Sequence, residues 1–288
     1  MGIRIVSDTG CDLTLEQAAE LDVEILPLTV CFENETREYK DRYEIDPSVY
    51  YERLLQCKEL PKTACVSPAL FQDSYARAAA AGDDVLVITI SSVISGCYAS
   101  AVAAAEDFKD HVHVVDTLWA TGGVQILVRE AVRMRAGGMD FKELCKAVDD
   151  EQKEIRMVGI FDTLEYARRG GRVSRVAYIA GEFLGVKPII TFTGGITDVV
   201  SKVRGWKAGN RAMIEYIKNK GGIDVSRPFC YSYAGNDDSK LVNYIKDSEV
   251  LYKGHKENLI IEQMGFTIGT YAGPGAICFG FFTAHENE

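Results

Sequence analysis

The chain has 288 residues, of which 47% are hydrophobic and 26% are charged, and its formal net charge is −10. This composition is typical of a globular protein with one large or two ordinary domains, and its acidity excludes nucleic-acid binding by the whole surface. No apolar run approaches the roughly 18 residues that span a bilayer, and the start of the chain lacks a signal-peptide core. A transient contact with a membrane surface stays open.

Eight cysteines are scattered along the chain without a CxxC pair. In a chain of this size the pattern is typical of reduced, small core residues, so we expect a cytoplasmic protein. The four histidines share no ligand spacing with a cysteine or a carboxylate pair. We therefore expect no metal site.

The first half of the chain alternates predicted strands with predicted helices. Thr14 to Gln17 has the capping-box pattern, and Pro47 follows Asp46 at a helix start. The predicted strands are residues 3–6, 23–30, 85–90 and 112–115; the predicted helices are residues 15–21, 47–56, a segment after Pro68, 95–107, 120–135 and 141–153. This order predicts an α/β protein whose N-terminal domain, residues 1–155, has three α/β/α layers around a parallel sheet.

The second half interrupts this alternation with a hairpin signal, Thr193-Gly194-Gly195. The predicted strands are residues 156–161, 188–192, 196–201, 228–233, 259–262 and 276–282; the predicted helices are residues 163–169, 208–218 and 238–247, with an apolar helical face over residues 173–184. We therefore predict a second α/β domain with a mixed sheet over residues 156–288.

Hydroxyl side chains gather in three loops beside predicted strand or helix ends. The buried-looking run of residues 85–90 ends in Ser91, Ser92 and Ser95 before a small-residue helix, and residues 7–9 and 62–67 carry further hydroxyls. Ligands of parallel sheets bind at the carboxyl ends of strands, and a helix N-terminus favours an anion. Ordinary capping explains each loop alone. For the three loops together, ordinary capping and a shared site for a carboxylate or phosphate explain the hydroxyls about equally well.

Two basic runs and one glycine-rich segment are further candidates. Residues 168–175 hold four arginines, which fit either a solvated helix end or a guanidinium aimed at an acidic ligand. Residues 202–207, which include Trp206, fit a strand-to-helix connection or a docking patch. Residues 268–276 predict a tight turn, either structural or closing over a ligand.

Catalytic signatures are missing from the sequence. There is no GxSxG elbow, no GxGxxG motif and no Walker A loop. His111 and His113 alternate with valines on a predicted strand, which favours edge or surface positions over a catalytic base. We therefore predict a binding protein without catalysis of its own.

Short motifs match one known family in family order over nearly the whole chain. They are Ser7-Asp8-Thr9, Lys62-Thr63 with Ser67, Ile90-Ser91-Ser92 with Ser95-Gly96 and Tyr98, Val115-Asp116-Thr117, Leu164-Glu165-Tyr166, Gly170-Gly171-Arg172-Val173, Lys187-Pro188-Ile189, Lys202-Val203-Arg204-Gly205, and Ile268-Gly269-Thr270 with Gly273-Pro274-Gly275. The chain thus resembles the DegV family, which includes the fatty-acid-binding FakB subunits of the bacterial fatty acid kinase.

The resemblance implies a two-domain α/β fold that buries the acyl chain of a long-chain fatty acid. It implies that hydroxyls at Thr63 and Ser92 hold the carboxylate with Arg172 nearby, and we place Ser95 and Tyr271 in the same site. It also implies that a separate ATP-dependent kinase receives the fatty acid, with Arg204 and Lys202 at the docking surface, and that the chain needs no cofactor.

Two residues depart from the pattern of many relatives. Ala64 replaces a serine of the second loop, and Tyr271 stands where relatives often carry a histidine. A tyrosine hydroxyl still donates a hydrogen bond but carries no charge near neutral pH.

Our hypothesis is a fatty-acid-binding protein that presents its ligand to a kinase. Two alternatives are an enzyme acting on a small anion at the same loops and a lipid-responsive regulatory protein. Turnover by the isolated chain would distinguish the first, and a partner affinity that depends on lipid loading would distinguish the second.

Overall fold

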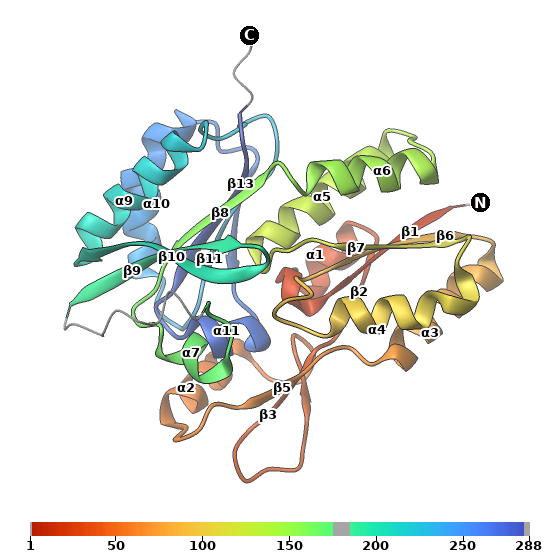
Figure 1. Ribbon diagram of the computed structural model, residues 1–288, viewed down its shortest axis with the longest axis horizontal. Coiled ribbons are helices and arrows are strands. Elements are labelled where there is room, and N and C mark those ends of the chain that lie inside the picture. The colour runs from red at the N-terminus through yellow and green to blue at the C-terminus, as the bar shows by residue number, and fades with distance from the viewer. Residues whose placement is uncertain (1, 175–184, 285–288) are drawn as a thin grey trace.

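A computed structural model describes residues 2–174 and 185–284. Most of the apolar helical face predicted over residues 173–184 lies outside this part of the chain. The described residues form three sheets with surrounding helices (Figure 1). The α/β class, with a parallel sheet in the N-terminal part and a mixed sheet in the C-terminal part, is as predicted.

The first sheet is parallel, with strand order β2-β1-β6-β7. Helices α3 and α4 cover one face, α5 and α6 cover the other, and α1 packs on β2 (Figure 1). The strands are β1 (Ile3–Asp8), β2 (Val23–Leu26), β6 (Asp84–Thr89) and β7 (Val112–Asp116); the helices are α1 (Leu15–Glu20), α3 (Pro68–Ala81), α4 (Cys97–Ala104), α5 (Gly122–Ala136) and α6 (Phe141–Glu151), with 3-10 turns η1 (Thr9–Cys11) and η2 (Ala105–Phe108). The predicted capping box of Thr14 with Gln17 is present at the start of α1.

The second sheet is mixed, with strand order β10-β9-β8-β13-β11-β12. The predicted hairpin is formed by β9 and β10, which pair antiparallel, whereas β11 and β12 pair in parallel. The strands are β8 (Ile155–Ile160), β9 (Val186–Thr193), β10 (Ile196–Arg204), β11 (Phe229–Tyr233), β12 (Leu259–Gln263) and β13 (Ile277–Phe282); the helices are α7 (Glu165–Gly170), α9 (Trp206–Asn219), α10 (Ser239–Tyr252) and α11 (Phe266–Ala272).

A third, small sheet has the order β4-β3-β5 and was not predicted. It belongs to residues 29–64, which we call the arm and which also contain a helix. The arm consists of β3 (Thr29–Cys31), β4 (Tyr39–Lys40), α2 (Pro47–Gln56) and β5 (Lys62–Ala64). Within the described residues the arm strands pair only with one another, so side chains attach the arm to the rest of the molecule.

The single strand predicted over residues 23–30 is wrong, because the segment divides into β2 and β3 in different sheets. Pro27 has no N–H to donate to a ladder. The N–H of Leu28 donates to Thr9 Oγ1 at 3.0 Å instead of to a neighbouring strand. The chain therefore leaves the first sheet at Pro27 and enters the arm.

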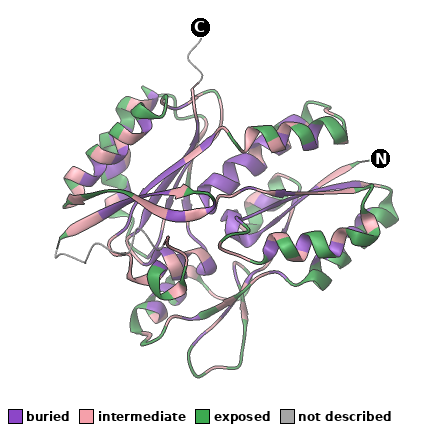
Figure 2. Ribbon diagram, viewed as in Figure 1, coloured by how far each residue is buried: buried purple, intermediate pink, exposed green. Residues whose placement is uncertain are grey.

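Helix α5 packs against both main sheets and is buried along most of its length (Figure 2). Its N-terminal end approaches β13 so closely that a Cβ on Gly280 would lie 3.0 Å from the backbone of Gly122 and Gly123. The helix begins at Gly122 rather than at residue 120 as predicted. Because α5 is shared by the two sheets, the proposed domain boundary at residue 155 stays a prediction.

Candidate functional site

The two loops that follow β1 and β6 meet at the carboxyl edge of the first sheet, as expected. Strand order reverses between these neighbouring strands, which is where open α/β sheets bind ligands. Here, however, the Asp8 carboxylate accepts hydrogen bonds from the N–H groups of Gly10 and Ile90, at 2.9 and 3.0 Å. Burial raises the pKa of Asp8 to about 6. These N–H donors therefore already have an acceptor from the chain itself.

The serine loop after β6 has one inward-facing and two outer hydroxyl residues. Ser91 is fully buried, and its hydroxyl donates to the carbonyl of Gly195 at 2.6 Å, which links the first sheet to the β9–β10 hairpin. Ser92 is exposed, and its backbone N–H donates to the Asp116 carboxylate at 3.0 Å. Ser95 is half-buried, and its hydroxyl accepts from the N–H of Cys97 at 3.3 Å, so α4 begins there rather than at Ser95.

Thr63, Arg172 and Tyr271 are brought together from three distant parts of the chain. The hydroxyls of Thr63 and Tyr271 lie 2.6 Å apart, and the Arg172 guanidinium carbon lies 4.6 Å from the centre of the Tyr271 ring. Arg172 also donates from Nε to the carbonyl of Ile94 at 3.1 Å and from Nη1 to the carbonyl of Gly170. A cation and two hydroxyls therefore converge beside the serine loop.

Local backbone geometry explains how these side chains are presented. Gly171 ends α7 in the left-handed region, with φ of 72°, and so turns the chain toward Arg172. A Cβ on Gly170 would overlap the ring of Tyr271, so the ring lies directly against the end of α7. The tight turn predicted over residues 268–276 is corrected: α11 continues to Ala272, and only the residues after it turn, with positive φ at Gly273 and Gly275.

An apolar cavity of about 50 Å³ adjoins this cluster. Its lining is Ile94, Ala120, Thr121, Phe161, Arg172, Phe192, Met264, Ile268, Tyr271, Ala272 and Cys278. Arg172 and Tyr271 thus bound both the cavity and the polar cluster. Sequence reasoning missed the apolar lining, because a core residue and a cavity-lining residue follow the same hydrophobic pattern.

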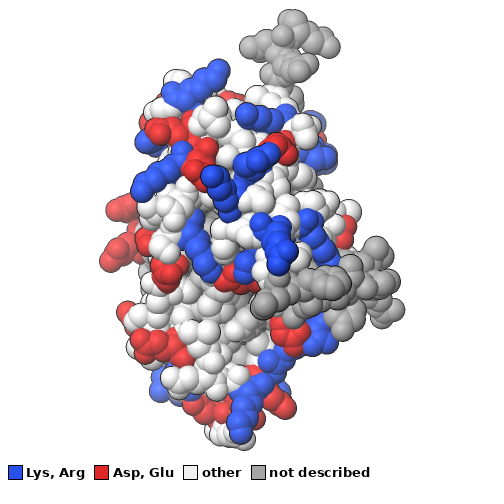
Figure 3. Space-filling model, turned by 90° about the vertical axis from the view of Figure 1, so that its left-hand side faces the viewer, with Lys and Arg blue, Asp and Glu red and all other residues white. Residues whose placement is uncertain are grey.

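Lys202 and Arg204, the predicted docking residues, lie on β10 with exposed side chains and do not line the cavity. Lys and Arg side chains gather on the face of the molecule shown in Figure 3. The aromatic residue of the same run, Trp206, is half-buried at the start of α9. The ammonium groups of Lys187 and Lys240 lie 5.9 and 4.7 Å from its ring centre.

His111 and His113 lie at the edge strand β7, as predicted. His111 contacts Asp84, and His113 contacts Asp149. Among residues 2–174 and 185–284, no three His, Cys, Asp or Glu side chains are grouped to hold a metal ion. In the same part of the chain, no helix has the length and apolar character needed to cross a bilayer.

Comparisons with known proteins agree with the fold. A family model described as "Uncharacterised protein, DegV family" matches residues 2–284. A DegV domain-containing protein of Caldanaerobacter subterraneus subsp. tengcongensis is 34% identical over 277 residues, covering 95% of this chain and 96% of that protein. A protein of Thermotoga maritima named "Fatty acid-binding protein" is 30% identical, covering 97% of each chain. A solved structure described as fatty acid binding of a DegV family protein from Thermus thermophilus superposes with a TM-score of 0.88 at 26% identity, covering 99% of this chain and 100% of that chain.

Proposed function

Because this chain belongs to the DegV family, we propose that it binds a long-chain fatty acid and needs no cofactor. The observation that carries the proposal is the apolar cavity bounded by Arg172 and Tyr271. The acyl chain occupies the apolar side, and the carboxylate faces Arg172, Tyr271 and Thr63. Two similar proteins named above are described as fatty-acid-binding, which supports this assignment.

The charge at this site suits a carboxylate. Arg172 forms no ion pair with the residues that the structure describes; its guanidinium contacts only two backbone carbonyls and the Tyr271 ring. A buried carboxylate is costly unless it is paired, and a guanidinium with neighbouring hydroxyls pairs it well. In this proposal Ser92 and Ser95 supply further hydroxyls at the rim.

The apolar side of the site supplies the affinity. Each methylene removed from water contributes about 0.8 kcal/mol, so a long acyl chain contributes on the order of ten kcal/mol before ordering costs. A volume of about 50 Å³ accommodates only a few water molecules. Admission of a whole acyl chain therefore requires the lining side chains to move apart.

Native mass spectrometry of the purified chain, followed by solvent extraction, tests the proposal. We expect a co-purified long-chain fatty acid near unit stoichiometry, or uptake of added palmitate by empty protein. A chain that stays empty and rejects added fatty acids would contradict the proposal, and turnover of a small anion would favour the enzyme alternative.

We further propose that the chain works in the cytoplasm and presents its fatty acid to a separate ATP-dependent kinase through the face that carries Lys202 and Arg204. These residues are exposed on an otherwise acidic chain, which suits an acidic partner surface. We expect Arg204→Glu to slow acyl-phosphate formation by an added fatty acid kinase without changing palmitate affinity. Lys218→Glu, an exposed charge reversal at the far end of α9, is the control. Equal rates for both variants would contradict this docking surface.

A further inference from the structure

Helix α11 carries Tyr271 but has no capping side chain of its own. Its N-cap residue is Gly265, which makes no side-chain hydrogen bond. The cap comes instead from the arm: the Asp41 carboxylate accepts from the N–H of Phe266 at 2.8 Å and from the N–H of Thr267 at 2.9 Å. A Cβ at position 265 would lie 2.8 Å from Asp41 Oδ1 and 3.1 Å from Asp12 Oδ1, so a larger residue there would displace these carboxylates.

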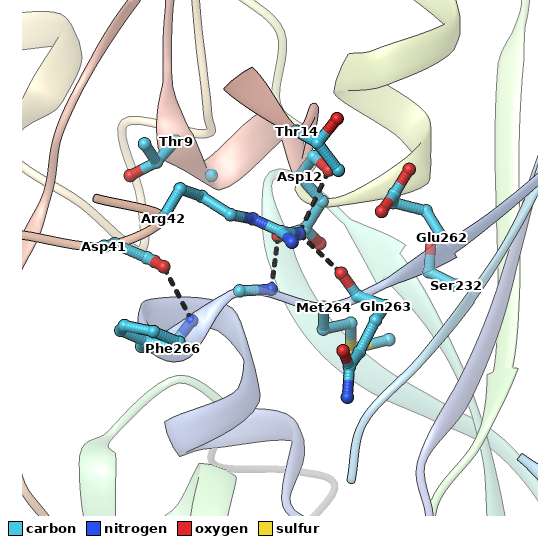
Figure 4. A network of polar contacts seen from close by, with 12 residues as sticks. Thr9, Asp12, Thr14, Asp41, Arg42, Ser232, Glu262, Gln263, Met264 and Phe266 are labelled. Atoms are coloured by element: carbon cyan, nitrogen blue, oxygen red, sulfur yellow. Dashed lines mark hydrogen bonds and ion pairs between the residues drawn. The ribbon is translucent and has the colours of Figure 1, made fainter. Parts of the chain in front are cut away.

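Asp41 is followed in the chain by Arg42, which belongs to a buried ionic cluster (Figure 4). The neighbouring Arg42 reaches from Nη2 to the carboxylate of Asp12 at 3.3 Å, to its carbonyl at 3.0 Å, and to the carbonyl of Gln263. Asp12 also accepts from the N–H of Gly265 at 2.7 Å. The cluster thus joins the loop after β1, the arm and the start of α11.

The backbone at this cluster is strained, which shows how firmly the surroundings fix it. Asp12 and Arg42 both lie in the left-handed region, with φ of 61° and 68°. Such conformations cost of order 1–3 kcal/mol each and persist only where the surrounding structure over-determines them. The left-handed conformations of Asp12 and Arg42 therefore indicate that the arm is rigidly attached to α11.

The arm contacts α11 along its length as well as at its start. The ring of Tyr50 stacks on Phe266 with centroids 4.5 Å apart, and its hydroxyl bonds to that of Thr270. At the far end of the helix, the arm contributes the Thr63 hydroxyl that meets Tyr271. One segment of the chain therefore fixes both the beginning of α11 and the partner of its last polar side chain.

We propose that Asp41 is a positioning residue for the fatty-acid headgroup: by capping α11 it sets the helix register that places the Tyr271 hydroxyl at Thr63 and beside Arg172. Asp41 contacts α11 and does not line the cavity, so it acts through Tyr271. The inference rests on the proposed function and assigns the arm a part in recognising the carboxylate.

The test compares two ligands of one chain length, laurate and 1-dodecanol, on the full chain by fluorescent-probe displacement. Asp41→Asn keeps the size of the side chain but leaves one acceptor oxygen for two N–H groups. We expect laurate affinity to fall at least about fivefold while 1-dodecanol affinity changes less than about twofold, because a charged carboxylate depends more on a positioned hydrogen-bond donor than a neutral alcohol does. Asp46→Asn is the matched control, since Asp46 caps α2 of the same arm at an exposed position.

Each outcome decides between positioning and other roles. Equal weakening of both ligands would make Asp41 merely structural, and unchanged laurate affinity would remove its role altogether; either result overturns the inference while the proposed function stands. A wild-type chain that binds neither ligand overturns both. Should Asp41→Asn not fold, Tyr50→Phe removes a single hydroxyl contact to α11 and keeps the ring stack. We then expect the same loss of laurate preference, and an unchanged preference overturns the inference.

Discussion

Tyr271 combines two roles that its hydroxyl and its ring perform separately. The hydroxyl meets Thr63 at 2.6 Å, and the ring supports the guanidinium of Arg172 at 4.6 Å. Cation–π contact of this kind holds an arginine in place without neutralising its charge. The Tyr271 ring thus holds Arg172 beside the cavity.

The two roles are separated by Tyr271→Phe, which keeps the ring and removes the hydroxyl. We expect palmitate affinity to fall about two- to tenfold, which corresponds to the roughly 0.5–1.5 kcal/mol of one hydrogen bond. Isothermal titration calorimetry measures the change. Tyr233→Phe on β11, outside the cavity lining, is the control and should bind palmitate like the wild type. If the two variants bind equally well, the Tyr271 hydroxyl has no part in headgroup binding.

At this scale the sequence pointed to part of the site. The resemblance implied hydroxyls at Thr63 and Ser92 with Arg172 nearby, and Tyr271 was added although relatives often carry a histidine there. The structure brings Thr63, Arg172 and Tyr271 together and leaves Ser92 exposed in the loop after β6, so their part in binding stays a prediction. Asp41 left no signal in the sequence, because it caps a helix 225 positions away and a glycine occupies the local N-cap. Capping patterns are read over three or four neighbouring residues, so a cap supplied by a distant segment is invisible to them.

Among the elements, α5 and β13 show how glycine allows a helix to approach a sheet. No side chain separates Gly280 from the backbone of Gly122 and Gly123. The close approach buries the start of α5 beneath the second sheet while its remaining length covers the first. The cavity is lined from both sides of this packing, for example by Ile94 after β6 and by Cys278 on β13.

Gly280→Ala tests the packing, because its Cβ would lie 3.0 Å from helix backbone that cannot rotate away. We expect the free energy of unfolding to fall by about 1–3 kcal/mol, the usual cost of overpacking. Urea titration followed by circular dichroism measures it. Gly137→Ala is the control: it lies at the exposed end of the same helix, has a negative φ of −72°, and its Cβ would be 3.3 Å from the nearest atom. A Gly280→Ala variant as stable as this control would show that α5 can shift.

Most helices and strands could be predicted from local patterns, and the failures have local causes. The capping residues Thr14 and Asp46 were sufficient to place the starts of α1 and α2, and the apolar run of β6 was sufficient to predict that strand. Pro27 divided a run whose hydrophobicity is continuous. Part of α11 was taken for a turn because it contains Gly269, where a Cβ would overlap the Tyr51 hydroxyl, and is followed by Gly273. The hairpin of β9 and β10 was indicated by its turn, whereas the pairing of the arm strands was not predictable, since they pair across up to 35 positions (Thr29 with Ala64).

For the molecule as a whole, the excess of acidic residues extends into the interior. Asp8, Asp12 and Asp41 are fully buried, and within the described residues Arg42 is the cation that pairs with one of them. Burial raises the pKa of Asp12 to about 7 despite the opposing effect of Arg42, and it raises the pKa of Asp41 as well. The structure near the arm therefore holds carboxyls that bind protons more tightly than they would in the unfolded chain.

These raised pKa values predict that stability falls as the pH rises from about 4 to about 7. Between the ordinary pKa of 3.8 and the folded values of about 6 for Asp8 and about 7 for Asp12, the folded chain holds more protons than the unfolded chain. For each extra proton that the folded chain holds, the free energy of unfolding falls by up to about 1.4 kcal/mol for every unit that the pH rises. Exposed acids with a lowered pKa, such as Asp150 at about 2, change the stability only at pH values below about 4. Urea unfolding at intervals from pH 4.5 to 8 measures the slope. The Asp8→Asn variant should show a smaller slope, even if the substitution also changes the overall stability. The Asp83→Asn variant, altered at the surface, should keep the wild-type slope. A wild-type stability that is constant or rising between pH 5 and 7 would mean that the buried carboxyls are not protonated there.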